Sequence, residues 1–261
     1  MDELSRFRLD ERAALVAGGS GGIGVRLCGA LAGAGAKVAI VGRDEQRLEA
    51  ARSAVEEAGS RALVLAGDVT REEAAERVVA EAAGDFGRLD ILVNAVGGGA
   101  GAALHDAENY TVEDWDWIMD LNLRSQFLVS RAAARAMIRA GRGGRILNIS
   151  SVRGQLGVRL GYSAYVAAKG AMNALTRQHA TEWAKHGITV NAISPTFVRT
   201  PQVESLLAAE SFRQGLLARI PLGRIAQPDD LVGAALFFCS DASSFVTGQV
   251  LTLDGGLTAT Q

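Results

Sequence analysis

Short apolar segments alternate with helical segments along the whole chain of 261 residues, and this alternation restricts the fold more than any other feature. The apolar segments are bounded by glycine or polar residues, which is typical of buried strands. The seven expected strands cover residues 13–17, 37–41, 61–66, 89–93, 145–149, 188–193 and 250–253. Strands that alternate with helices form parallel sheets covered on both faces. Because no linker or repeat interrupts the pattern, we predict a single doubly wound α/β domain over residues 1–261, with a seven-stranded, mostly parallel sheet.

The connecting segments carry helix signals. The expected helices cover about residues 23–33, 45–58, 71–86, 111–140, 162–186 and 228–240, with a further helix within residues 196–215. Thr70 is expected to cap the third helix, because Glu73 follows it three residues later in a capping-box pattern. Ser194 and Pro195 are expected to end the sixth strand.

Composition limits the partners that the chain can have. The formal net charge of −2 disfavours a surface for nucleic acid or anionic membrane. No apolar run approaches the roughly 18 residues of a membrane span, and residues 1–12 are charged, unlike a signal peptide. Cys28 and Cys239 show no metal-ligand spacing and are expected to be buried free thiols. We therefore expect a cytoplasmic protein with no metal site.

A glycine-rich turn joins the first expected strand to the first expected helix. Gly18, Gly22 and Gly24 stand in this turn. Backbone N–H groups and the helix dipole at such a turn can hold a phosphate, and glycine lets the backbone come close. The spacing differs from the usual G-x-G-x-x-G, so the alternative is a flexible tight turn. The strand context favours a dinucleotide site.

The end of the second expected strand bears on the choice of dinucleotide. In such folds a carboxylate there binds the ribose 2′-hydroxyl, whereas an arginine accommodates a 2′-phosphate. Here Arg43 comes first and Asp44 second. We expect Arg43 to contact a 2′-phosphate; the alternative is a solvated arginine, with Asp44 capping the next helix.

Tyr165 and Lys169 are four residues apart on an expected helix, so their side chains are neighbours. A cation beside a phenol lowers its pKa from about 10, and the phenol then serves as an acid or base near neutral pH. The pattern also arises by chance on amphipathic helices. Ser150 and Ser151 end the fifth expected strand, where these sheets bind ligands, and Asn122 is a polar residue in an apolar segment.

Together these motifs resemble the classical short-chain dehydrogenases/reductases over nearly the whole chain. The matching residues are Gly18, Gly22, Gly24, Asp68, Asn94 to Gly97, Asn122, Ser151, Tyr165, Lys169, Pro195, Thr200, Thr247 to Gln249 and Asp254 to Gly256. The chain resembles members that reduce 3-oxoacyl thioesters and members that act on sugars or polyols, and the substrate class stays open among a 3-oxoacyl thioester, a sugar or polyol, and a cyclic ketone. The resemblance implies a Rossmann fold and hydride transfer between NAD(H) or NADP(H) and a ketone or secondary alcohol.

The resemblance also implies roles for individual residues. Tyr165 would be the general acid and base, Lys169 would lower its pKa and bind the nicotinamide ribose, Ser151 would bind the substrate oxygen, and Asn122 would hold a water molecule that links Lys169 to solvent. The other residues expected to bind the cofactor are Gly18, Ser20, Gly22, Ile23, Gly24, Arg43, Asp68, Val69, Asn94, Pro195, Val198 and Thr200.

Four departures from the family pattern stand out. They are Ala17 in place of threonine, Ala95-Val96 in place of Asn-Ala, Thr196 in place of glycine, and a loop before Tyr165 that is one residue longer than usual. The longer loop leaves Ser150 as the alternative to Ser151. None of the four removes a catalytic group.

The leading hypothesis is therefore a cytoplasmic oxidoreductase that prefers NADP(H), with NAD(H) possible, and that acts on a small carbonyl or alcohol substrate. The alternatives are a dinucleotide-binding regulator or scaffold without catalysis and an epimerase or dehydratase of the same fold. Substrate contacts are expected in residues 97–109, 152–161 and 196–215, with Arg153, Gln155 and Arg159 as polar candidates or as solvated loop residues. By resemblance we expect a homotetramer, with residues 111–140 and 162–186 in one interface.

Overall fold

The computed structural model describes residues 3–98, 101, 103–159 and 161–259. Seven strands form one parallel sheet in the order β3-β2-β1-β4-β5-β6-β7. Their bounds are β1 Ala13–Ala17, β2 Lys37–Gly42, β3 Ala62–Ala66, β4 Ile91–Asn94, β5 Gly144–Ile149, β6 Ile188–Pro195 and β7 Val250–Leu253. The predicted doubly wound α/β sheet is confirmed, and all of its pairings are parallel.

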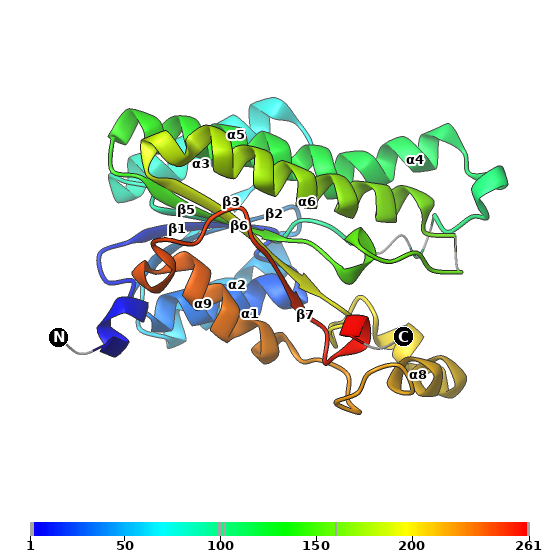
Figure 1. The fold of residues 1–261 in the computed structure, drawn as a ribbon. Coiled ribbons are helices and arrows are strands. Elements are labelled where there is room, and N and C mark those ends of the chain that lie inside the picture. Colours follow the sequence, from blue (N-terminus) through cyan, green and yellow to red (C-terminus); the bar gives the residue numbers. More distant parts are fainter. Residues whose placement is uncertain (1–2, 99–100, 102, 160, 260–261) are drawn as a thin grey trace.

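Helices cover both faces of the sheet (Figure 1). Helices α3 (Glu72–Phe86), α5 (Ser125–Ala140) and α6 (Ser163–Trp183) lie on one face, and α1 (Gly22–Gly33), α2 (Glu45–Glu57) and α9 (Val232–Cys239) lie on the other. Helix α4 (Val112–Met119) precedes α5, and the short helices α7 (Glu204–Ala208) and α8 (Glu210–Leu217) lie between β6 and β7 in the chain. Within these described residues, no helix combines the length and the apolarity that a membrane crossing requires.

The central strands have no solvent-facing side, which explains their unbroken apolar sequences. Ala13, Leu15 and Ala17 of β1 pack into the core beneath α3 and α5. The alternate residues Ala14 and Val16 pack into the core beneath α1, α2 and α9. Because successive side chains of a strand point to opposite faces, a strand buried on both faces must be apolar at every position.

Three sequence-based expectations are corrected. β6 continues through Pro195, because Ser194 and Pro195 pair with Thr252 and Leu253 of β7. Arg71, not Thr70, is the N-cap of α3, and the Thr70 hydroxyl instead donates to Asp68 at 2.9 Å.

The third correction concerns the expected helix over residues 111–140. One π-helical turn, Asp120–Arg124, interrupts it and separates α4 from α5.

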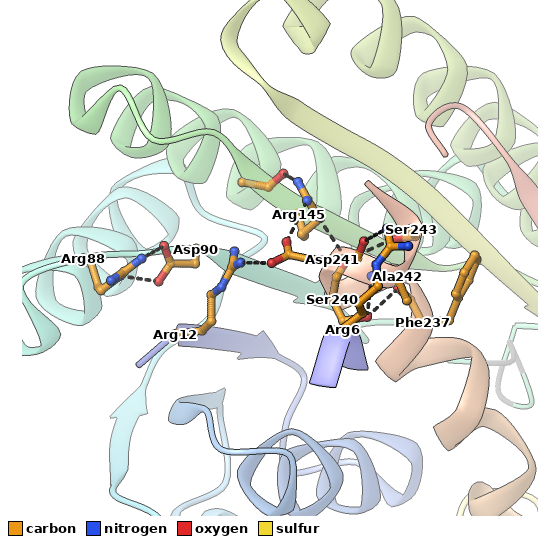
Figure 2. A network of polar contacts seen from close by, with 11 residues as sticks. Arg6, Arg12, Arg88, Asp90, Arg145, Phe237, Ser240, Asp241, Ala242 and Ser243 are labelled. Atoms are coloured by element: carbon orange, nitrogen blue, oxygen red, sulfur yellow. Dashed lines mark hydrogen bonds and ion pairs between the residues drawn. The ribbon is translucent and has the colours of Figure 1, made fainter. Parts of the chain in front are cut away.

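A polar network ties the amino ends of the strands together at the edge opposite the glycine turn (Figure 2). The buried carboxylate of Asp90 accepts the Ala13 N–H of β1 at 2.9 Å and two Arg88 N–H bonds at 2.7 Å. Nearby, Asp241 binds Arg12 at 2.7 Å and Arg145 at 3.2 Å. The network joins the start of the chain to the segment after α9.

Candidate active site

Two adjoining cavities open along the carboxyl ends of the strands, where open α/β sheets bind ligands. The larger cavity, about 650 Å³, lies over the turns that follow β1, β2 and β3. The smaller cavity, about 200 Å³, lies over the ends of β5 and β6. Both are bordered by Ala95 to Gly98 and by Gln202, so they form one elongated groove.

The glycine turn lies at the inner wall of the larger cavity. Gly18 has φ +81°, and a Cβ atom on Gly24 would lie only 2.1 Å from the Gly18 carbonyl oxygen. A side chain at either position would disrupt the turn. Gly21, the N-cap of α1, offers no side-chain acceptor to the first N–H groups of the helix. A close-packed turn below an uncapped helix N-terminus fits the pyrophosphate of a dinucleotide.

The far end of the larger cavity is basic. Arg43 and Arg47 both line it, and both are exposed. Asp44 is not part of the lining, and its carboxylate accepts the Arg47 N–H at 3.1 Å as the N-cap of α2. One Asp44 oxygen therefore caps the helix and the other lies 3.5 Å from the Arg47 Nε atom, whereas the two guanidinium groups suit a phosphate.

The larger cavity is also lined by several other residues that were expected to bind the cofactor. Ser20, Gly22, Asp68 and Val69 line it. The Asp68 carboxylate accepts the Thr70 N–H at 3.1 Å, which holds it in place. Trp117 and Leu121 also line this cavity.

Ser151, Tyr165 and Lys169 meet in the smaller cavity. Ser151 lies two residues after the end of β5, while Tyr165 and Lys169 lie one turn apart on α6. The Ser151 side chain lies in the same cavity wall as the Tyr165 hydroxyl, where it acts to lower the pKa of that hydroxyl. The Lys169 Nζ atom lies 5.7 Å from the centre of the Tyr165 ring and donates to the Ile149 carbonyl at 3.0 Å.

Burial sets the protonation of this pair. It raises the pKa of the Tyr165 hydroxyl to about 12, against the smaller, opposite effect of the Ser151 hydrogen bond. It also lowers the pKa of the Lys169 ammonium to about 8, because a buried charge is poorly solvated. The pKa of Tyr165 is therefore raised and not lowered, so that Tyr165 is a protonated phenol at neutral pH, and the expected effect of Lys169 on this pKa stays a prediction.

Asn122 occupies the π-helical turn and is completely buried. Its amide nitrogen donates to the Ile118 carbonyl at 3.1 Å, and its side-chain oxygen accepts the Gly98 N–H at 3.0 Å. A Cβ atom on Gly97 would lie 2.8 Å from that oxygen and 3.3 Å from Lys169 Nζ. Asn122 thus lies next to Lys169 and fixes the border between the two cavities. π-turns inside helices are frequent at functional sites.

The two serines at the end of β5 differ in their bonding. Ser150 donates to the Asn173 side chain at 2.6 Å and so connects β5 to α6. Its hydroxyl proton is used within the fold, whereas the Ser151 hydroxyl faces Tyr165. The geometry therefore favours Ser151 over Ser150 as the residue that contacts a substrate.

The remaining expected residues divide into lining and supporting positions. Ile23, Pro195, Val198 and Thr200 line the smaller cavity. Asn94 does not line either cavity, because its side chain donates to Ser130 at 2.8 Å and to Asn148 at 2.9 Å within the core.

The three polar candidates for substrate contacts lie in different environments. Arg153 is 8% exposed and lines the smaller cavity. Gln155 donates to Thr252 at 3.1 Å, and Arg159 is exposed outside the lining.

Sequence reasoning missed Arg47 and Gln202. Arg47 lies in the first turn of α2, close in sequence to Arg43, and this proximity could have signalled a second cation at the same end of the cavity. Gln202 packs against Gly98, where a Cβ atom would lie 2.3 Å from its amide nitrogen. No local sequence signal marks Gln202, because the loop that carries it crosses the groove only in the folded chain.

Comparison with known proteins agrees with this geometry. Residues 17–258 match a family model described as enoyl-(acyl carrier protein) reductase. The gluconate 5-dehydrogenase of Gluconobacter oxydans is 43% identical over 258 residues, which is 99% of each chain. A short-chain type dehydrogenase/reductase from Mycobacterium marinum is 34% identical, with a TM-score of 0.93 over 98% of this chain and 99% of that one. A gluconate 5-dehydrogenase from Burkholderia cenocepacia in complex with NADP and tartrate is 37% identical, with a TM-score of 0.92 over 99% of each.

The chain belongs to the short-chain dehydrogenase/reductase family. It is an oxidoreductase that transfers hydride between a nicotinamide dinucleotide and a ketone or secondary alcohol. The readings as a regulator without catalysis and as an epimerase or dehydratase are not favoured, because the named relatives are dehydrogenases.

Proposed function

We propose that this oxidoreductase prefers NADP(H) and interconverts a secondary alcohol and a ketone in a small, polyhydroxylated substrate. The observation that carries the proposal is the meeting of Ser151, Tyr165 and Lys169 in a cavity continuous with the dinucleotide cradle. The cofactor, when bound, supplies or accepts the hydride.

In this proposal the residues of the site either transfer a proton or hold the substrate, the cofactor and the surrounding backbone in place. Tyr165 gives its hydroxyl proton to the carbonyl oxygen during reduction and takes it back during oxidation. Ser151 donates to the same substrate oxygen and stabilises the charge that develops there. Lys169 binds the nicotinamide ribose, and Asn122 holds the backbone that borders both cavities.

The cofactor preference follows from the basic end of the larger cavity. Arg43 and Arg47 supply two cations, and Asp44 is engaged as a helix cap. The Burkholderia relative has NADP bound, which supports the same choice.

The substrate class follows from the relatives and from the size of the smaller cavity. The Gluconobacter and Burkholderia relatives are both named for gluconate. A cavity of about 200 Å³ suits a small substrate better than a long acyl chain.

We further propose a homotetramer in the cytoplasm. Trp117 and Phe127 are large apolar side chains exposed on α4 and α5, and they offer surface for a subunit contact. Cys28 and Cys239 are buried free thiols, which fits a reducing compartment.

Calorimetric titration with NADPH and NADH, followed by a turnover assay on sugar alcohols and sugar acids, tests the proposal. NADPH should bind more tightly than NADH, and Tyr165→Phe should abolish turnover without loss of NADPH binding. Binding of neither dinucleotide by the folded protein, or full activity of Tyr165→Phe, would overturn it.

A further inference from the structure

Arg153 is a buried cation in the wall of the smaller cavity. The side chain belongs to the 3₁₀ turn Val152–Gly154, directly after Ser151, and is 8% exposed. Its Nη1 atom is buried and has no hydrogen-bond partner among the described residues. Arginine is almost never buried in this way unless it is paired.

The surroundings of Arg153 do not supply a counter-charge. The described residues that line the smaller cavity include neither aspartate nor glutamate. The Tyr162 ring lies 5.9 Å from the Arg153 guanidinium carbon, which gives a cation–π contact but no hydrogen-bond acceptor for Nη1.

A second arginine makes the environment still less favourable for the charge. Burial lowers the pKa of Arg153, and the nearby positive charge of Arg219 lowers it further. An anion from outside the chain would stabilise a buried guanidinium that lies close to a second guanidinium.

The position of Arg153 relates this anion to the reaction. Ser151 accepts the Arg153 backbone N–H at 3.1 Å, so the two residues are held in one short turn. Ser151, Arg153 and Tyr165 line the same cavity. A group held by Arg153 would therefore lie in the cavity where Ser151 and Tyr165 meet, within reach of the same small molecule.

We propose that Arg153 binds a carboxylate of the substrate, so that the enzyme interconverts a hydroxy acid and the corresponding oxo acid. The inference rests on the proposed function and narrows its substrate class. In the oxidative direction the carbinol carbon loses a hydride to NADP⁺ and the hydroxyl loses its proton to Tyr165. The carboxylate stays unchanged and serves only to orient the substrate. A planar guanidinium can hold a carboxylate by two parallel hydrogen bonds.

The test compares acids with neutral analogues of the same length. NADP⁺ reduction is measured with D-gluconate and D-galactonate, and with D-glucitol and galactitol, for the wild type and for Arg153→Gln, Arg153→Lys and Arg139→Gln. Arg139 is an exposed arginine in the last turn of α5 and serves as the matched control.

Arg153→Gln should raise the KM for the acids roughly tenfold to hundredfold, the range expected for a hydrogen bond to a charged group, with a much smaller effect on neutral polyols. Arg153→Lys should recover part of the loss, and Arg139→Gln should behave as the wild type. Oxidation of neutral polyols with no preference for acids would overturn the inference but keep the proposed function.

Calorimetry on the NADP⁺-loaded enzyme gives a second measurement that does not need turnover. Binding of the same acids that weakens in Arg153→Gln, while NADP⁺ affinity is unchanged, supports the inference even where an acid is not oxidised. If no acid binds, the inference is wrong. If inorganic phosphate binds through Arg153 and the acids do not, the site recognises a phosphate group and the carboxylate assignment is overturned.

Discussion

The ammonium nitrogen of Lys169 lies 5.7 Å from the ring centre of Tyr165, and both residues line the smaller cavity, Lys169 buried and Tyr165 half-buried. Burial moves their pKa values toward the neutral forms, to about 12 for Tyr165 and about 8 for Lys169. At neutral pH the Tyr165 phenol therefore carries the proton that ketone reduction consumes but holds it tightly, and the pKa of the nearby Lys169 ammonium lies at about 8. Two predictions concern this pair.

The first prediction concerns the direction of the reaction. Oxidation needs the Tyr165 phenolate, whose fraction rises up to tenfold per pH unit while the pH is below the pKa. We expect kcat/KM for alcohol oxidation to rise from pH 7 to pH 10, and kcat/KM for ketone reduction to show no such rise. Initial rates in both directions, measured in buffers of constant ionic strength, check this. An oxidation rate that is independent of pH would contradict it.

The second prediction concerns the free energy of unfolding. Burial lowers the pKa of Lys169 from its ordinary value of 10.5 to about 8 in the folded state. At 1.36 kcal/mol per pKa unit, the charged Lys169 therefore costs the folded state roughly 3 kcal/mol. The whole cost is present below pH 8, where Lys169 is charged in both the folded and the unfolded state. It falls as the pH rises from 8 to 10.5 and vanishes above 10.5, where Lys169 is neutral in both states. The free energy of unfolding of Lys169→Met, relative to that of the wild type, should therefore be higher at pH 7 than at pH 10.

Urea unfolding at pH 7, 8.5 and 10 measures this difference. Lys185→Met is the control, since Lys185 is exposed and its replacement removes no buried charge. Equal differences between Lys169→Met and the wild type at all three pH values would show that the Lys169 charge is not under strain in the folded chain.

The third prediction concerns cofactor choice. Arg43→Ala and Arg47→Ala should each weaken NADPH binding by roughly 1–3 kcal/mol and leave NADH binding nearly unchanged, because each removes a charged contact to the 2′-phosphate. Arg52→Ala is the control, since Arg52 lies further along α2, pairs with Glu56 at 2.8 Å and does not line the cavity. Equal losses for NADPH and NADH would show that these arginines do not recognise the 2′-phosphate.

The fourth prediction concerns the opposite edge of the sheet. Asp90→Ala removes the acceptor for the Ala13 N–H and leaves Arg88 without its carboxylate, so it should destabilise the fold by about 2–4 kcal/mol. Thermal or urea unfolding measures the loss. Glu56→Ala, which breaks an exposed pair with Arg52, should cost well under 1 kcal/mol. Equal effects would mean that the buried network contributes no more than a surface pair.

The sheet could be predicted from the sequence because its strands are buried on both faces, so that apolar runs such as Ala13–Ala17 mark them without ambiguity. The end of β6 was missed because Pro195 is a local stop signal, whereas its pairing with Leu253 of a distant strand is a tertiary contact. The same limit applies to α3, where Thr70 bonds Asp68 instead of capping the helix.

The site residues on α6 and β5 could be predicted because the spacing of Tyr165 and Lys169 and the position of Ser151 are local features. Tertiary burial cannot be read from spacing, and it reverses the direction expected for the pKa of Tyr165. Arg153 looked like an ordinary loop arginine for the same reason, since only the folded chain shows that it is enclosed.

The π-helical turn Asp120–Arg124 also makes the site sensitive to chain length. Such a turn contains one residue more than an α-helix of the same rise, and one residue of an α-helix corresponds to about 100° of rotation. Deleting a single residue from this turn would let α4 and α5 merge into one regular helix, with the sheet and core intact. The Asn122 amide would then rotate away from Gly98. We therefore expect deletion of a single residue from this turn to abolish activity, whereas most substitutions in the same turn would not.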